Sequence, residues 1–289
     1  MTCALSETID GIIDRQLEEA ARGHSPRVID EADVVDIVNR LNITLGRVYV
    51  AALRNGIWPK RYVRNLGMLC IEDQLCLMTS QVTIIGAGGL GGTLILLLAR
   101  LGIGTLVVVD HDVFDETNLN RQAISTGALL GKPKASCAAE MVKAINPSVT
   151  VQAFTQKTDA ENTDHFLEGS SLVVDALDNI QDRFILEAAA KSKGIPYIFG
   201  AIAGFMGQVM TVYPDDPGLE KIYGNSDADA AKINGTESIV GVPPLSPSLI
   251  GTIQAMEVLK VLLNRDYLLR RDMLYIDMET MQFERIPAV

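Results

Sequence analysis

The chain contains 289 residues, of which 48% are hydrophobic, and it carries a formal net charge of −11. This length suits one large domain or one domain with an appendage, and the hydrophobic content excludes a globally disordered chain. An acidic surface repels phosphate backbones and anionic lipids, so we expect neither nucleic acid nor a membrane as a partner.

In chain order, the first predicted elements are helices. Residues 1–60 place apolar side chains at roughly helical spacing, and the turn-forming pair Asn55-Gly56 lies near the end of this region. We interpret residues 1–60 as an N-terminal helical extension and residues 61–289 as one larger domain.

Strands and helices alternate after the extension. Strands are predicted over 81–85, 105–110, 148–154, 171–178 and 196–202, and helices over 93–102, 132–145 and 183–194. This alternation predicts an α/β fold with a Rossmann-type, mostly parallel sheet. Segments 207–214 and 273–286 alternate like antiparallel edge strands. The polar segment Asp215–Ser238 is predicted to be a mobile loop over the site.

A glycine-rich turn, Gly86-Ala87-Gly88-Gly89-Leu90-Gly91, separates the first of these strands from a helix. In such a G-x-G-x-x-G turn the first glycine permits the bend, the second admits a phosphate, and the third lets helix and strand pack closely. The phosphate then meets the free amides at the positive end of the helix. We therefore predict that Gly86, Gly88, Gly89 and Gly91 bind a nucleotide.

Asp110 closes the second strand, where a carboxylate can accept hydrogen bonds from ribose hydroxyls. The glycine turn and this carboxylate suit NAD as well as ATP, so a dehydrogenase is an alternative. A dehydrogenase would also need an acid or base near the hydride acceptor. We do not expect His24, His111 or His165 to be placed for that role.

A polar cluster after Asp110 favours ATP. It comprises Asn118, Asn120, Arg121, Gln122, Lys132 and Lys134. Arg121 and Lys134 can neutralise a triphosphate, and the asparagines can hold its oxygens or the ribose. Hydride transfer has no use for two such cations, because NAD already places its pyrophosphate on the helix.

Two carboxylates, Asp175 and Asp178, lie at the end of the fourth strand. The carboxyl ends of parallel strands face the crevice where ligands bind. Mg²⁺ prefers oxygen ligands together with substrate phosphates, so this position predicts a magnesium ligand beside the nucleotide.

Segments between about residues 61 and 265 make the chain resemble the ubiquitin-activating-enzyme-like superfamily, the HesA/MoeB/ThiF family. It looks most similar to the branch that contains molybdopterin-synthase adenylyltransferase and the thiazole sulfur-carrier adenylyltransferase. The matching segments are RYVRNLG, VTIIGAGGLGG, VVVDHDVFDETNLNRQ, GKPKA, INPSV, VVDALDNIQDRF, IPYIFGAIAGFMGQV and LIGTIQAMEVLK.

The resemblance implies an ATP-binding adenylyltransferase domain over 61–289. Such enzymes convert the C-terminal Gly-Gly carboxylate of a small ubiquitin-like sulfur carrier and ATP to an acyl-adenylate and pyrophosphate. The implied roles are ribose binding by Asp110, ATP contacts by Asn118 and Arg121, phosphate binding by Lys134, and Mg²⁺ binding by Asp178. Gln122 is included among the nucleotide-binding residues.

Arg64, in RYVRNLG, matches the position from which a partner subunit reaches into the site, so the resemblance implies a homodimer. Two other readings remain open. A related branch adenylates a carboxylate on a modified tRNA nucleoside, and a non-catalytic member would bind a ubiquitin-like protein without turnover.

The four cysteines, Cys3, Cys70, Cys76 and Cys137, form no Cys-x-x-Cys pair. Relatives commonly carry two such pairs, so we expect no zinc here. Relatives also often place a cysteine where this chain has Glu237 or its neighbours, so we do not expect a covalent thiol step. We interpret Cys70, Cys76 and Cys137 as core residues. The N-terminus lacks the pattern of a signal peptide, which favours a reducing cytoplasm.

Overall fold

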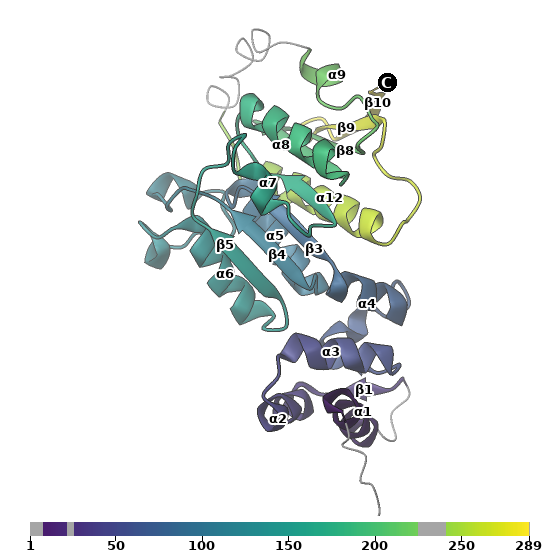
Figure 1. Ribbon diagram of the computed structural model, residues 1–289. Coiled ribbons are helices and arrows are strands. Elements are labelled where there is room, and N and C mark those ends of the chain that lie inside the picture. The colour runs from purple at the N-terminus through teal and green to yellow at the C-terminus, as the bar shows by residue number, and fades with distance from the viewer. Residues whose placement is uncertain (1–7, 22–25, 225–240, 289) are drawn as a thin grey trace, which may run out of the picture.

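The computed structural model describes residues 8–21, 26–224 and 241–288. Cys3, His24 and Glu237 lie outside the described residues. The N-terminal part contains helices α1, α2 and α3, a short two-stranded parallel sheet, a 3₁₀ turn η1 and helix α4 (Figure 1). Their bounds are α1 Ile9–Ala20, β1 Val28–Ile29, α2 Glu31–Leu41, α3 Leu45–Arg54, β2 Trp58–Pro59, η1 Lys60–Asn65 and α4 Ile71–Thr79.

The predicted mostly parallel sheet is confirmed. Within the described residues it has eight strands in the order β10-β9-β8-β7-β6-β3-β4-β5. The parallel strands are β3 Gln81–Ile85, β4 Thr105–Val109, β5 Thr150–Phe154, β6 Leu172–Asp175 and β7 Tyr197–Ala203. The antiparallel edge comprises β8 Met206–Val212, β9 Asp272–Asp277 and β10 Gln282–Pro287. Segment 273–286 therefore lies within the antiparallel hairpin formed by β9 and β10.

Helices cover both faces of the sheet, which explains why its parallel strands are continuous apolar runs. Helices α5 Gly89–Leu101, α6 Lys134–Ile145 and α12 Leu245–Leu262 pack with Val82 and Ile84 on one face. Helices α7 Thr163–Phe166 and α8 Ile180–Lys193 pack with Ile85 on the other. Successive strand residues point to opposite faces, so this division follows directly from the sequence of β3. The short elements η2 Glu116–Asn118, η3 Gly127–Leu129 and α9 Glu220–Tyr223 complete the described fold.

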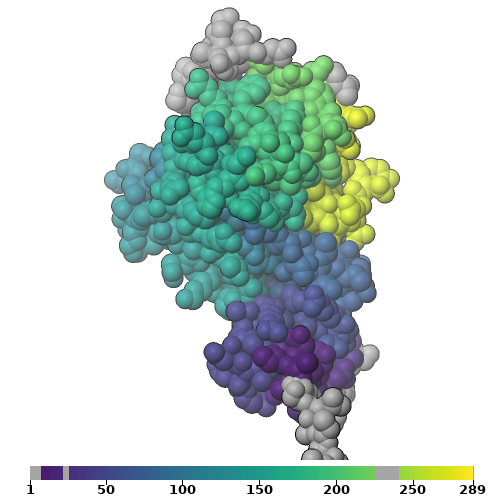
Figure 2. All heavy atoms as spheres, viewed as in Figure 1, coloured from purple at the N-terminus to yellow at the C-terminus, as the bar shows by residue number. Residues whose placement is uncertain are grey.

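The N-terminal helices have a hydrophobic core of their own, which includes Ile13, Val34 and Val48. The same cluster continues into Tyr62 of η1 and Met78 of α4. In the space-filling view this purple part forms a lobe beside the body that contains the sheet (Figure 2). The extension is helical as predicted, and the parallel pair β1–β2 is an addition that its sequence did not predict.

A buried polar contact joins this lobe to the larger domain. The side-chain amide of Asn146 donates to Tyr62 Oη and to the carbonyl of Ala99, both at 2.8 Å. Arg61 donates to the carbonyl of Ile145 at 3.0 Å and to the carboxylate of Glu31 at 2.7 Å. The 3₁₀ turn η1 is therefore hydrogen-bonded both to Glu31 of the N-terminal lobe and to Ile145 and Asn146 of the larger domain.

Three details differ from the predictions. Residues 215–224 are not a loop over the site: Asp216 is buried and accepts hydrogen bonds from the Tyr213 amide and from Arg270, and α9 follows. The rest of the predicted loop, 225–238, lies outside the described residues. Strand β6 ends at Asp175, whereas the strand was predicted over 171–178. Helix α6 begins at Lys134, whereas the helix was predicted over 132–145, because Pro133 occupies its N-cap.

The cysteine prediction was right for Cys137, which is buried, and wrong for Cys70, which is exposed. Cys70 is the N-cap of α4, and its Sγ accepts from the amide of Asp73 at 3.4 Å. Cys76 is half-buried and donates to the carbonyl of Leu262. Among the described residues, no helix has the length and apolarity needed to cross a membrane.

Candidate nucleotide-binding site

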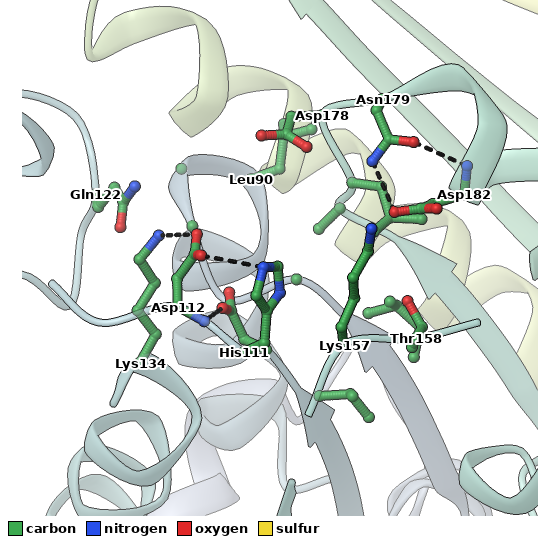
Figure 3. A pocket seen from close by; sticks show the side chains of 18 of the residues that line it. Leu90, His111, Asp112, Gln122, Lys134, Lys157, Thr158, Asp178, Asn179 and Asp182 are labelled. Carbon is green, nitrogen blue, oxygen red and sulfur yellow. Dashed lines mark hydrogen bonds and ion pairs between the residues drawn. The ribbon is translucent and has the colours of Figure 1, made fainter. Parts of the chain in front are cut away.

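A pocket opens at the carboxyl ends of β3, β4, β5 and β6 (Figure 3). Strand β3 lies between β4 and β6. The strands that follow it in sequence are added first on one side, as β4 and β5, and then on the other, as β6, and a crevice forms where the strand order reverses. The lining includes Gly86, Gly88, Gly89, Leu90, Asp110, His111, Asp112, Arg121, Gln122, Lys134, Lys157, Asp178, Asn179 and Asp182.

The glycine turn forms one wall of the pocket, and two of its positions tolerate no side chain. Gly86 has a φ of +100°, and a Cβ there would lie 2.4 Å from the carbonyl oxygen of Ala176. A Cβ at Gly91 would lie 1.9 Å from the carbonyl oxygen of Gly86. Gly88 is the N-cap of α5 and offers no side chain to the first-turn amides, so these donors are available to a ligand.

Asp110 braces this turn and also lines the pocket. Its Oδ2 accepts from the Ala87 amide at 2.7 Å and its Oδ1 from the Asp112 amide at 2.8 Å. Burial raises the pKa of Asp110, while these two amides and the nearby Lys134 oppose the rise. A carboxylate has about four acceptor sites, so about two remain for hydroxyl donors of a ligand.

The two predicted cations meet in this pocket. Lys134 is buried at the first turn of α6, and its Nζ lies 3.0 Å from Oδ2 of Asp112. Arg121 donates to the carbonyl of Thr117 at 2.8 Å and to Oδ1 of Asn120 at 2.9 Å. The wall that they form is therefore cationic, with one carboxylate beside the lysine.

Gln122 also lines the pocket, and its side chain is 7% exposed. Its Oε1 is buried without a hydrogen-bond partner among the described residues. Leaving a buried polar atom unpaired is unfavourable, so this oxygen indicates a donor supplied by a ligand.

Of the two predicted acidic residues, one lies in the pocket and the other does not. Asp178 follows β6, is exposed, and makes no hydrogen bond with a described residue (Figure 3). Asp175 is fully buried and does not line the pocket, so its prediction as a candidate magnesium ligand was wrong. Its Oδ2 accepts from Tyr197 Oη at 2.5 Å and from Arg183 at 3.2 Å. Burial raises the pKa of Asp175, and Arg183 opposes this.

Besides Asp175, five predicted residues do not line the pocket: Gly91, Asn118, Asn120, Lys132 and Arg64. Asn118 uses its side chain to cap η2, accepting from the amide of Asp115 at 3.1 Å. Its carbonyl accepts from the amides of Arg121 and Gln122, so it supports both residues through the backbone. Lys132 is exposed and does not line the pocket, and Arg64 is exposed on η1 away from its own pocket.

Sequence reasoning missed part of the lining. Lys157 and Thr158 follow β5, and the rule that ligands lie at the carboxyl ends of strands could have identified them. His111 and Asp112 also line the pocket, with His111 Nε2 3.3 Å from Asp112 Oδ1. His111 was not expected beside a ligand, although it directly follows Asp110.

Comparisons with known proteins identify the family of the chain. Residues 62–288 match the model of the ThiF family. The SAMP-activating enzyme E1 of Haloferax volcanii is 37% identical over 230 residues, which cover 78% of this chain and 84% of that protein. The sulfur carrier protein adenylyltransferase of Thermus thermophilus is 35% identical, over 66% of this chain and 72% of that protein. Some curated relatives are longer: the match covers 48% of an Arabidopsis thaliana protein and 60% of a Porphyra purpurea protein.

Among solved structures, E. coli MccB with AMPCPP and MccA superposes with a TM-score of 0.69 at 17% identity. The similarity covers 99% of this chain and 89% of MccB, and at that identity it shows the fold alone. The family match spans the whole sheet and every glycine of the turn. The chain therefore belongs to the ThiF family.

Proposed function

We propose that the chain is an ATP-dependent adenylyltransferase that activates the C-terminal Gly-Gly carboxylate of a small ubiquitin-like sulfur carrier. The observation that supports this best is one pocket containing the glycine turn, the cations Arg121 and Lys134, and the carboxylate of Asp178, which is paired with no described residue. The names of the Haloferax and Thermus relatives point to the same class of reaction and of protein substrate.

ATP fits the groups that line the pocket. The amides of the α5 first turn would hold phosphate oxygens, and Asp110 would accept hydrogen bonds from the ribose. The unpaired Oε1 of Gln122 would accept one further donor from the nucleoside. Asn118 would act indirectly, because its carbonyl holds the amides of Arg121 and Gln122.

The reaction needs charge stabilisation more than a general base, because a C-terminal carboxylate is already ionised at neutral pH. The carboxylate oxygen forms a bond to the α-phosphorus, the bond from that phosphorus to the bridging oxygen breaks, and pyrophosphate leaves with the electron pair. Arg121 and Lys134 would stabilise the charge that develops on the leaving pyrophosphate. Asp178 would hold a Mg²⁺ ion, which supplies further positive charge to the phosphates.

Arg64 would complete the site of a second subunit in a homodimer. The other polar side chains of η1 are all paired within the described residues: Lys60 with Asp30, Arg61 with Glu31, Tyr62 with Asn146, and Asn65 with Gln74. Arg64 is exposed and has no hydrogen bond or ion pair with a described residue. A turn whose other polar side chains are paired, and whose Arg64 has no described partner, supports a role for this guanidinium outside its own subunit.

Adenylation would proceed without a protein thiol and without structural zinc. Single replacement of Cys3, Cys70, Cys76 or Cys137 by Ser should leave ATP–pyrophosphate exchange intact, because the acyl-adenylate forms without an enzyme nucleophile. Loss of exchange in one correctly folded variant would reveal a catalytic cysteine. Elemental analysis that finds about one zinc per chain would contradict the metal assignment.

ATP–pyrophosphate exchange tests the proposed function. Labelled pyrophosphate should enter ATP only when the enzyme, Mg²⁺ and a ubiquitin-like sulfur carrier ending in Gly-Gly are all present. The same carrier with an amidated C-terminus is the control, because it lacks the nucleophilic carboxylate. Calorimetric titration should show that ATP binds and that NAD binds weakly or not at all. Tight NAD binding without ATP binding would refute the proposal.

A further inference from the structure

A buried ion pair between Asp175, which lies behind the pocket, and Arg183, which also lines the pocket, holds the short segment that connects β6 to Asp178. Asp175 is 0% exposed and Arg183 is 2% exposed, and their charged groups lie 3.2 Å apart. Removing two charges from water is unfavourable, and a well-packed apolar pair is often equally stable at such a place. A role beyond stability would explain a charged pair at this position.

The ion pair controls the backbone between Asp175 and Asp178. Asp175 Oδ1 accepts from the amide of Leu177 at 2.8 Å, and Arg183 Nη2 donates to the carbonyl of Leu177 at 2.5 Å. Gln254, from α12, donates to the carbonyl of Asp175 at 2.7 Å. Both polar groups of Leu177, the residue directly before Asp178, are therefore bound to the two charged side chains.

The ion pair is itself fixed by β7. Tyr197 Oη donates to Asp175 Oδ2 at 2.5 Å, and Arg183 Nη1 donates to the carbonyl of Gly200 at 2.7 Å. The guanidinium also lies 5.1 Å from the ring centre of Phe199. Residues from β6, β7, α8 and α12 thus converge on one turn. The Asp178 carboxylate at its end lines the pocket and has no partner in the described part of the chain (Figure 3).

We propose that Asp175 and Arg183 are positioning residues that fix the direction of the Asp178 carboxylate toward the metal-bound phosphates. This inference rests on the proposed function, in which Asp178 binds Mg²⁺. Neither residue is a metal ligand itself, and both act through the two hydrogen bonds to Leu177.

Calorimetric titration of ATP, with Mg²⁺ and with EDTA, measures this effect without turnover. Asp178→Asn should abolish the gain in affinity that Mg²⁺ provides. Asp175→Asn and Arg183→Lys should reduce the gain in ATP affinity that Mg²⁺ provides by about 10–100-fold, the range found when partners of metal ligands are removed. Tyr197→Phe removes one donor to Asp175 and should give a smaller loss. ATP binding in EDTA should stay unchanged in Asp175→Asn and Tyr197→Phe, because neither residue lines the pocket.

Glu257→Gln is the matched control for neutralising a buried acid. Glu257 is 1% exposed and accepts from Thr211 Oγ1 and from the Leu269 amide, outside the pocket. This variant should lower thermal stability without changing the Mg²⁺ effect. If Asp175→Asn does not fold, Arg183→Lys and Tyr197→Phe decide the question.

The outcomes separate the two proposals. If the wild-type protein shows neither exchange nor an effect of Mg²⁺ on ATP binding, the proposed function fails. If wild type and Asp178→Asn behave as expected but Asp175→Asn and Arg183→Lys match wild type, only the positioning inference is overturned. An equal loss of the Mg²⁺ effect in Glu257→Gln would also overturn it, because the loss would then report general destabilisation.

Discussion

The ammonium of Lys134 lies 3.0 Å from the carboxylate of Asp112, although the lysine is buried and the aspartate is half exposed. A triphosphate in the pocket would compete with this carboxylate for the same cation. The pairing holds the lysine in place without surrounding it with fixed partners, so the ammonium can turn from one anion to another.

Replacing Lys134 with Met should lower the rate of ATP–pyrophosphate exchange by about 10²–10³, the usual effect of removing one group that stabilises transition-state charge. The free energy of unfolding should change by less than about 1 kcal/mol, because the abandoned carboxylate of Asp112 remains hydrated. Lys132→Met is the control, since Lys132 is exposed and does not line the pocket. Equal exchange rates in the two variants would remove Lys134 from the proposed site.

Replacing Gly91 with Ala should disrupt the glycine turn. The new Cβ would lie 1.9 Å from the carbonyl oxygen of Gly86, so α5 must move away from β3. We expect a loss of about 1–3 kcal/mol in the free energy of unfolding, measured by urea denaturation. ATP affinity should fall at least about tenfold, which corresponds to roughly 1.4 kcal/mol. Gly127→Ala is the control, because a Cβ there meets no atom within 4 Å. Identical behaviour of the two variants would show that α5 tolerates the shift.

Mixed dimers test whether Arg64 acts on the partner's site. Arg64→Ala and Asp178→Ala homodimers should each lose nearly all exchange activity, since an arginine supplied by a partner contributes about 10³–10⁵ in related phosphoryl transfers. Mixing the two variants should restore activity, because one site of each mixed dimer then contains both intact residues.

Arg54→Ala, which removes an exposed arginine at the end of α3, is the control and should keep full activity. Absence of complementation would place Arg64 in its own subunit's site. Normal exchange by the Arg64→Ala homodimer would remove it from catalysis altogether.

The Asp216–Arg270 ion pair predicts a stability change at acidic pH. Burial would raise the pKa of Asp216, but hydrogen bonds from Arg270, the Tyr213 amide and Arg271 lower it below its usual value. A lowered folded-state pKa gives stability that is present above the unfolded pKa of about 3.9 and is lost as the pH falls through the folded value.

Asp216→Asn should therefore be less stable than wild type by about 1–2 kcal/mol at pH 7, and the difference should shrink below about pH 4. Urea denaturation at several pH values measures it. Asp215→Asn, at the exposed neighbouring residue, should show no such difference. If the difference in the free energy of unfolding between Asp216→Asn and wild type stays constant down to pH 3, the lowered pKa of Asp216 is contradicted.

The sequence predicted the parts of this protein that depend on local pattern. The strand Gln81–Ile85, the glycine turn after it and the carboxylate of Asp110 follow from residue type and spacing, because a phosphate-binding turn needs glycine at fixed positions. The mostly parallel sheet follows from the alternation of strands with helices, and the family follows from ordered segments along the chain. These features involve residues that are close in sequence.

Asp175 and Asp178 show what the sequence could not separate. Both lie at the carboxyl end of β6 and carry the same group. Asp175 is buried against Arg183 and Tyr197, whereas Asp178 lines the pocket and pairs with no described residue. The difference arises from Arg183 of α8, eight residues after Asp175, and from Tyr197 of β7 and Gln254 of α12, which lie further along the chain and bind Asp175. Likewise, Lys157 reaches the pocket because β5 lies beside β4, and Asp216 is held by Arg270 from far along the chain. Local pattern determined which groups are available, and long-range packing decided which of them are buried, paired or free to meet a ligand.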